Sequence, residues 1–276
     1  MEGANKRRWP GVLAATAALG ILLTSAGSRS MAVSSPAAAP APPAVMAAVT
    51  AGAKARRAVP EKELPPETIY GLVSESEAVA DEYFDDAVFL GDSRTEGFYL
   101  YSGLGHGTYF YAVGATVSSV FTKAAWETPE GKIPLLDAVS GTVPGKIYMM
   151  FGVNELGWTK TDNFKEQYAE VIDRVREDHP EAQIVLQSIL PVSAKQDAKK
   201  TYVNNERIAV YNAIIETLAE EKDCFYVNAA EAVTGPDGCL PADLNFDGIH
   251  LNPAGCRLWR DYLRTHSVAP PESPTP

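Results

Sequence analysis

Cysteine is scarce in this sequence, which contains only three: Cys224, Cys239 and Cys256. No two of them have the Cys-x-x-Cys spacing of zinc sites and dithiol redox motifs. We therefore expect no metal or redox motif built on cysteine, and no cofactor is predicted. Because the number is odd, the cysteines cannot all pair within one chain. Cys239 and Cys256 could form a disulfide, and free buried thiols are the alternative that we favour.

Basic side chains are scarce in most of the chain. The sequence has 24 basic and 35 acidic side chains, and residues 1–60 hold seven of the basic ones and one of the acidic ones. The remainder therefore holds 17 basic and 34 acidic side chains, a net charge of −17. Nucleic-acid binding needs a basic face for the phosphates, so we expect no nucleic-acid partner.

The apolar segment near the N-terminus is short for a membrane span. Residues 12–23 carry no charge, follow the basic residues 6–8 and precede the small residues 25–27. This pattern predicts a signal peptide over residues 1–29. An uncleaved signal anchor is the alternative, because residues 9–27 approach the length of about 20 residues that a span needs. Either reading places the rest of the chain outside the cytoplasm, secreted or tethered to the membrane.

The segments that flank the expected domain are rich in proline. Residues 30–60 combine proline and alanine with few large apolar side chains, which predicts a disordered spacer. Residues 61–84 form a lead-in segment, and residues 85–267 form the expected domain. The tail, residues 268–276, is again predicted to be disordered.

Strand and helix patterns alternate along the domain. Apolar runs over residues 87–90, 108–113, 146–151, 183–190 and 224–227 predict five buried strands. Apolar residues at helical spacing between Asp162, a candidate cap, and His179-Pro180 predict a helix. Further helices are expected over residues 208–219 and after Asn252-Pro253. The alternation predicts an α/β fold with a parallel sheet covered by helices on both faces.

A candidate nucleophile follows the first predicted strand. Ser93 lies in the segment FLGDSRTEG, at an expected strand-to-helix turn where backbone N–H groups can hold an anion. The alternative is that Ser93 or Asp92 only caps the helix. Sites in such folds gather at the carboxyl ends of the strands, which is where this segment lies.

His250 is the best candidate base for Ser93. A serine hydroxyl needs an adjacent base, usually a histidine that a carboxylate orients. His250 lies in NFDGIHLNPAG, three residues after Asp247, and the other three histidines have no such motif. An Asp247-Gly248 surface turn with an incidental histidine is the alternative.

Two further polar positions follow predicted strands. Gly114 comes after the second strand in YAVGATVSS, and Asn154 comes after the third in FGVNELGW. The Gly114 N–H and the Asn154 side-chain amide are candidate oxyanion donors, together with the Ser93 N–H. Taken singly, each position is also consistent with an ordinary turn or cap.

Together these four segments resemble the SGNH hydrolase (GDSL-like lipase/acylhydrolase) family. GDS supplies Ser93, YAVG supplies Gly114, GVN supplies Asn154, and DGIH supplies Asp247 and His250, in the family's order over residues 85–266. The resemblance implies a flavodoxin-like three-layer α/β/α fold with a central parallel sheet of about five strands. It also implies a Ser-His-Asp triad at the carboxyl edge and a metal-free acyl-enzyme mechanism.

Two residues depart from the family's pattern. Arg94 stands where the GDSL motif has leucine, and Glu155 stands where many members have aspartate. Because of these two departures, the motifs do not identify the type of substrate. The Gly-x-Ser-x-Gly elbow of α/β-hydrolases is absent, which sets that alternative aside.

The expected activity is hydrolysis of carboxylic esters by a monomer. An exported enzyme meets extracellular polymers first, so we expect acetyl groups on glycans as substrate, with lipid esters second. An O-acyltransferase with the same triad and a non-catalytic binding module are the alternatives. Three aromatic residues after the nucleophile could line a substrate pocket, although the buried face of a helix is the interpretation that we favour: Phe98, Tyr99 and Tyr101.

Overall fold

The computed structural model describes residues 70–268 of the 276-residue chain. The predictions for the signal segment, the spacer and all but the first residue of the tail lie outside these residues. Within them, no helix is long and apolar enough to cross a membrane. No group of three or more histidine, cysteine or acidic side chains in this part of the chain could hold a metal ion.

Six parallel strands form the central sheet, in the order β1-β8-β7-β6-β2-β3. The strands are β1 Gly71–Leu72, β2 Ala87–Gly91, β3 Thr108–Tyr111, β6 Lys146–Met150, β7 Gln183–Gln187 and β8 Phe225–Val227. The five strands expected from the apolar runs are all present. The sixth, β1, pairs Gly71 with Phe225 and lies in the segment expected to be a lead-in.

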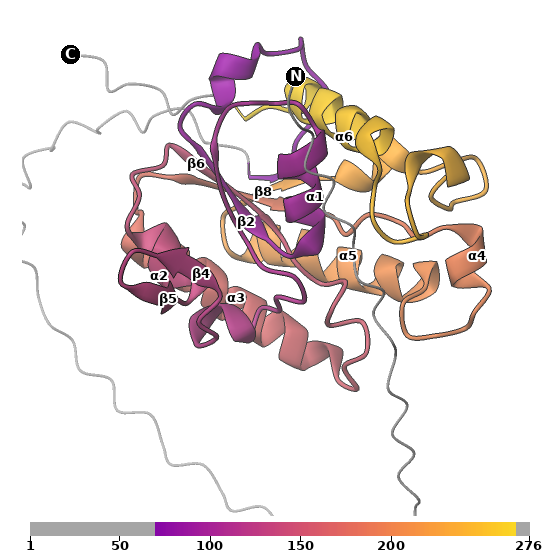
Figure 1. Cartoon of the computed structure of the whole chain (residues 1–276), viewed down its shortest axis with the longest axis horizontal. Coiled ribbons are helices and arrows are strands. Elements are labelled where there is room, and N and C mark those ends of the chain that lie inside the picture. The colour runs from indigo at the N-terminus through magenta and orange to yellow at the C-terminus, as the bar shows by residue number, and fades with distance from the viewer. Residues whose placement is uncertain (1–69, 269–276) are drawn as a thin grey trace, which may run out of the picture. The chain divides into compact units, whose positions relative to one another are not determined.

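Helices cover both faces of the sheet (Figure 1). Helix α1 (Ser93–Tyr101) and helix α6 (Pro253–Thr265) pack on one face, against strand residues such as Phe89 and Tyr148. Helices α2 (Leu135–Ser140), α3 (Thr161–Asp178) and α5 (Asn205–Glu221) pack on the other, against residues such as Leu90 and Met149. Because successive strand side chains point to opposite faces, these uniformly apolar strands fill two cores at once.

Shorter elements are attached to this three-layer domain. Strands β4 (Trp126–Thr128) and β5 (Gly131–Ile133) form an antiparallel hairpin outside the main sheet. The remaining elements are helix α4 (Ala194–Asp197) and the 3₁₀ helices η1 Asp81–Phe84, η2 Ser119–Phe121, η3 Ala229–Val233 and η4 Ala242–Leu244.

The start of α6 agrees with the prediction from the sequence, whereas the start of α3 does not. Asn252 caps α6 by accepting the N–H groups of Ala254 and Gly255, with Pro253 at the first helical position as expected. Asp162 is not the cap of α3, because the helix already begins at Thr161. Its carboxylate lies in the first turn, where it faces the positive end of the helix dipole.

All three cysteines are free thiols. Cys224 and Cys256 are buried, and Cys239 is half-buried. The alternative of a Cys239–Cys256 disulfide is therefore not found.

Candidate active site

The structure brings Ser93, His250 and Asp247 into one chain of hydrogen bonds. Ser93 Oγ lies 3.0 Å from His250 Nε2, and His250 Nδ1 lies 2.8 Å from Asp247 Oδ2. The side chains of His250 and Asp247 are 30% and 49% exposed, so solvent and small molecules can reach them. The arrangement matches what a serine nucleophile with a carboxylate-oriented base requires. The catalytic roles of these residues stay a prediction.

The Asp247 carboxylate orients the histidine from within its own loop. Besides the imidazole, it accepts the backbone N–H groups of Ile249 at 2.9 Å and His250 at 2.8 Å. Burial alone would raise the pKa of Asp247, but the hydrogen bonds from His250 and Ile249 outweigh it and hold the pKa well below its ordinary value. The carboxylate therefore stays ionised at neutral pH.

A glycine lets this loop rest on the segment that follows β7. Gly248 has a φ of +93°, and a Cβ atom there would lie 2.5 Å from Ser193 Oγ. Its carbonyl accepts the Ser193 N–H at 2.9 Å, and its own N–H donates to Asn245 Oδ1 at 2.7 Å. Only glycine combines this backbone conformation with such a close approach.

Asp92 caps α1 and leaves the Ser93 hydroxyl free to face the histidine. The Asp92 carboxylate accepts the Arg94 N–H at 2.8 Å, so the cap that the sequence left open belongs to Asp92. The preceding Gly91 permits the turn, since a Cβ atom there would collide with Thr95 and lie 2.7 Å from the Met150 carbonyl.

The candidate oxyanion donors lie at the same edge of the sheet. Gly114 follows β3 with a φ of +73°, and a Cβ atom there would meet nothing within 4 Å, so its surroundings are open. The Asn154 amide donates to the Ala115 carbonyl at 2.9 Å and to Asp92 Oδ2 at 3.3 Å. Asn154 thus joins the loop of Gly114 to the turn of Ser93.

Glu155 is fully buried behind this region. One carboxyl oxygen accepts the Val117 N–H at 2.7 Å, and the other has no hydrogen-bond partner among the described residues. Burial raises the pKa of Glu155 to about 8, and the nearby charge of Asp92 acts in the same direction. A neutral Glu155 at pH 7 is therefore expected.

The other histidines have partners unrelated to a nucleophile. His106 pairs with Asp85, and His179 Nε2 lies 3.1 Å from the Val139 carbonyl. The His266 ring stacks on Tyr262 with ring centroids 3.7 Å apart. Within the described part of the chain, His250 is the histidine that faces a serine hydroxyl next to a carboxylate.

The three aromatic residues of α1 have different environments. Phe98 is fully buried, whereas Tyr99 is 52% exposed. Tyr101 is half-buried, and its ring contacts Phe246, the residue before Asp247. The expectation of one buried face is therefore right for Phe98 and wrong for Tyr99, because the two residues point to different sides of the helix.

Sequence reasoning missed the environment of Arg94, which is only 3% exposed. The available signal was its place in the family's motif, where the usual leucine indicates a buried position. Because this position is buried, the arginine that occupies it here carries its charge into the interior of the domain.

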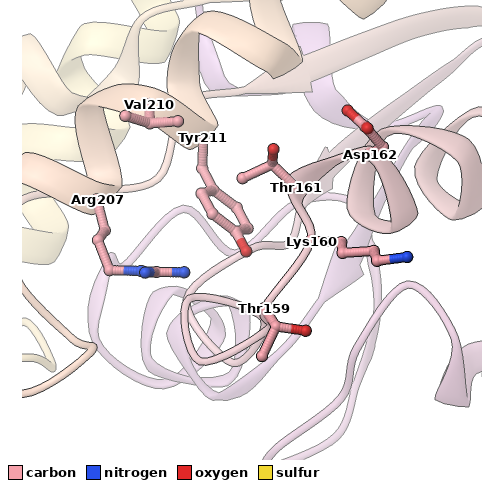
Figure 2. Close-up of a pocket in the computed structure, with 7 residues that line it drawn as sticks. All are labelled: Thr159, Lys160, Thr161, Asp162, Arg207, Val210 and Tyr211. Carbon is pink, nitrogen blue, oxygen red and sulfur yellow. The ribbon is translucent and has the colours of Figure 1, made fainter. Parts of the chain in front are cut away.

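A separate hollow of about 260 Å³ lies where α3 and α5 begin. Figure 2 shows Arg207 and Tyr211 of α5 directed toward the segment of Thr159 and Lys160. None of Ser93, Asp247 and His250 lines it. Its link to the candidate site is indirect, through the Tyr211 hydroxyl, which donates to the Glu155 carbonyl at 2.7 Å.

The sequence matches the GDSL-like lipase/acylhydrolase family over residues 89–258. The chain belongs to this family. The match spans more than half of the chain, includes every candidate residue above, and confirms the resemblance stated from the four motifs. Membership identifies the chain as a hydrolase of the GDSL (SGNH) type.

Solved structures of this fold are similar to the chain. A Streptococcus pneumonia protein described as a platelet activating factor is 23% identical, with a TM-score of 0.52 over 64% of this chain and 81% of its own. A structure from Parabacteroides merdae described as a GDSL-like lipase is 17% identical, with a TM-score of 0.51 over 65% of this chain and 94% of its own. These identities support the fold alone. No curated protein matches the sequence.

Proposed function

We propose that this GDSL-type hydrolase is an exported serine esterase that removes short acyl groups, above all acetyl groups, from glycans. The observation that carries the proposal is the chain of hydrogen bonds from Ser93 through His250 to Asp247, at distances of 3.0 and 2.8 Å. Binding alone needs no such relay, whereas acyl transfer through a serine does.

The proposed reaction has two acyl-transfer steps. His250 takes the Ser93 proton as the Ser93 oxygen attacks the ester carbonyl, and the leaving alcohol receives that proton. Water then attacks the acyl-enzyme in the same way. Asp247, ionised at neutral pH, holds the imidazole in the required tautomer and stabilises its charged form.

The oxyanion would be held by the N–H groups of Ser93 and Gly114 and by the Asn154 amide. Both N–H groups of the Asn154 side-chain amide already donate hydrogen bonds, so a substrate oxygen must replace one of the two present acceptors. The contact to Asp92 is the longer, at 3.3 Å, and is therefore the weaker one to exchange. One such donor typically stabilises a transition state by about 3–4 kcal/mol.

Expected location and charge support the proposed substrate class. The basic and apolar pattern of residues 1–29 supports export, with the domain secreted or held at the membrane by that segment. The acidic domain disfavours an anionic lipid surface and is compatible with an uncharged glycan ester.

The test is hydrolysis of nitrophenyl esters from acetyl to long acyl chains by the full chain and its Ser93→Ala variant. We expect hydrolysis of the acetyl ester, release of acetate from an acetylated polysaccharide, and a loss of about 10⁶-fold in the variant. A preference for long acyl chains would replace the glycan substrate by a lipid. Failure of the folded wild type both to cleave any ester and to react with a serine-directed fluorophosphonate would reject the proposed function.

A further inference from the structure

Arg94, the residue after the proposed nucleophile, carries a buried charge. Its side chain is 3% exposed, and Nη1 donates to the Leu190 carbonyl at 2.8 Å. Its Nε and Nη2 atoms are buried without hydrogen-bond partners among the described residues, and no carboxylate there lies within salt-bridge distance. Burying an incompletely paired cation is unfavourable, so its presence next to Ser93 calls for a compensating role.

Arg94 remains charged despite its burial. Burial lowers the pKa of Arg94 to about 10, and the nearby charges of Asp92 and Asp247 act in the opposite direction. The guanidinium is therefore a cation at neutral pH. It lies close enough to interact electrostatically with both the cap of α1 and the proposed triad carboxylate.

Arg94 also ties the nucleophile turn to the loop of the histidine. Leu190, which accepts its hydrogen bond, lies three residues before Ser193 in the segment that follows β7. The Ser193 N–H donates to the Gly248 carbonyl, inside the loop of Asp247 and His250. The Arg94 side chain thus holds the segment after β7, which in turn contacts the loop of Asp247 and His250.

We propose that Arg94 is a positioning residue for the triad, which fixes the Ser93 turn against the His250 loop. The inference rests on the proposed esterase function. Three contacts carry it in sequence: Arg94 to the Leu190 carbonyl, Ser193 to the Gly248 carbonyl, and His250 to Asp247.

The matched variants are Arg94→Leu, which restores the family's usual residue, Arg94→Lys, which keeps the charge, and Arg257→Leu, which removes a charge from the exposed face of α6. We expect Arg94→Leu to lower kcat on nitrophenyl acetate about 10- to 100-fold with little change in KM, because the triad loses its alignment. Arg94→Lys, whose ammonium can still donate to the Leu190 carbonyl, should recover much of the lost kcat, and Arg257→Leu should leave kcat unchanged.

Two readouts separate this inference from the proposed function and from misfolding. Thermal unfolding shows whether each variant folds, and the NMR signals of the His250 ring in the full chain report its alignment with Ser93 and Asp247 without any turnover. A folded Arg94→Leu variant with unchanged kcat and unchanged His250 ring signals would overturn the role of Arg94 while leaving the esterase intact. An equal loss of kcat in Arg94→Lys and Arg94→Leu, with unchanged His250 ring signals, would also overturn it. A wild type that cleaves no ester would reject the proposed function instead, and the His250 ring signals would still test whether Arg94 positions the loop.

Discussion

Ser93 and His250 are 157 positions apart in the chain, yet Ser93 Oγ lies 3.0 Å from His250 Nε2. Ser93 is the first residue of α1, and His250 lies three residues before the start of α6. These helices pack against each other through Phe98 and Trp259, whose ring centroids are 4.4 Å apart. The contact between the proposed nucleophile and its base is therefore set by the packing of two helices on one face of the sheet.

Replacing Asp247 by asparagine should reduce turnover strongly without unfolding the protein. Asparagine keeps an oxygen for the N–H groups of Ile249 and His250, but its amide cannot accept the imidazole N–H in the same orientation and carries no charge. We expect kcat on nitrophenyl acetate to fall by about 10⁴-fold, as in other serine triads. Steady-state kinetics with Ser93→Ala as the lower limit measures the loss. Activity close to that of the wild type would remove Asp247 from the triad.

Glu155 should make the protein less stable as the pH rises from about 4.5 toward 8. Burial raises the pKa of Glu155 from 4.5 to about 8 in the folded state. Between these values the folded state holds a proton that the unfolded state has lost, so stability falls as the pH increases. In Glu155→Gln this contribution disappears, while an oxygen remains to accept the Val117 N–H.

The measurement is the melting temperature of both proteins between pH 5 and 8. We expect the wild type to lose more stability across this range than Glu155→Gln does. Parallel curves would show that the carboxyl of Glu155 ionises normally.

The core strands and the site segments could be predicted from the sequence because their signals are local. Each core strand is a short apolar run, and Gly91 and Gly152 end two of them with the turn residue that the fold needs. The strands that precede Ser93, Gly114 and Asn154 are parallel, so their carboxyl ends lie on the same side of the sheet. The structure brings these residues together there with the Asp247–His250 loop.

Other features depend on tertiary contacts and had no local signal. Strand β1 has only two residues, too few for any periodicity, and exists because it pairs with β8. The burial of Arg94 contradicts the usual exposure of arginine and follows from its position in the first turn of α1, which faces the segment after β7. The exposure of Tyr99 depends on the rotation of α1 about its axis, which one helical turn of sequence does not determine.

Alanine at position 248 should disturb the loop that carries Asp247 and His250. It would combine a φ of +93° with a Cβ atom 2.5 Å from Ser193 Oγ, so both strain and a clash result. We expect a loss of about 1–3 kcal/mol in stability and lower kcat, because the His250 loop must move. Gly114→Ala is the control for stability, since its φ is +73° but its Cβ would meet no atom within 4 Å. Denaturant unfolding should therefore show a smaller loss for Gly114→Ala, and equal losses would mean that the Ser193 contact is unimportant.

Tyr99 should matter for polymeric substrates and not for small esters. Its exposed ring lies 5.8 Å from that of Tyr111, and Tyr111 pairs in register with Gly91, two residues before Ser93. Aromatic faces bind sugar rings through apolar contact, so these rings offer a polysaccharide a surface close to the nucleophile. We expect Tyr99→Ala to raise the KM for an acetylated polysaccharide several-fold and to leave kcat/KM for nitrophenyl acetate unchanged. Tyr70→Ala is the control, because Tyr70 is also exposed but precedes β1, at the opposite edge of the sheet from β3. An equal effect of both variants on the polymer would mean that a general loss of aromatic surface, and no site beside Ser93, accounts for the change.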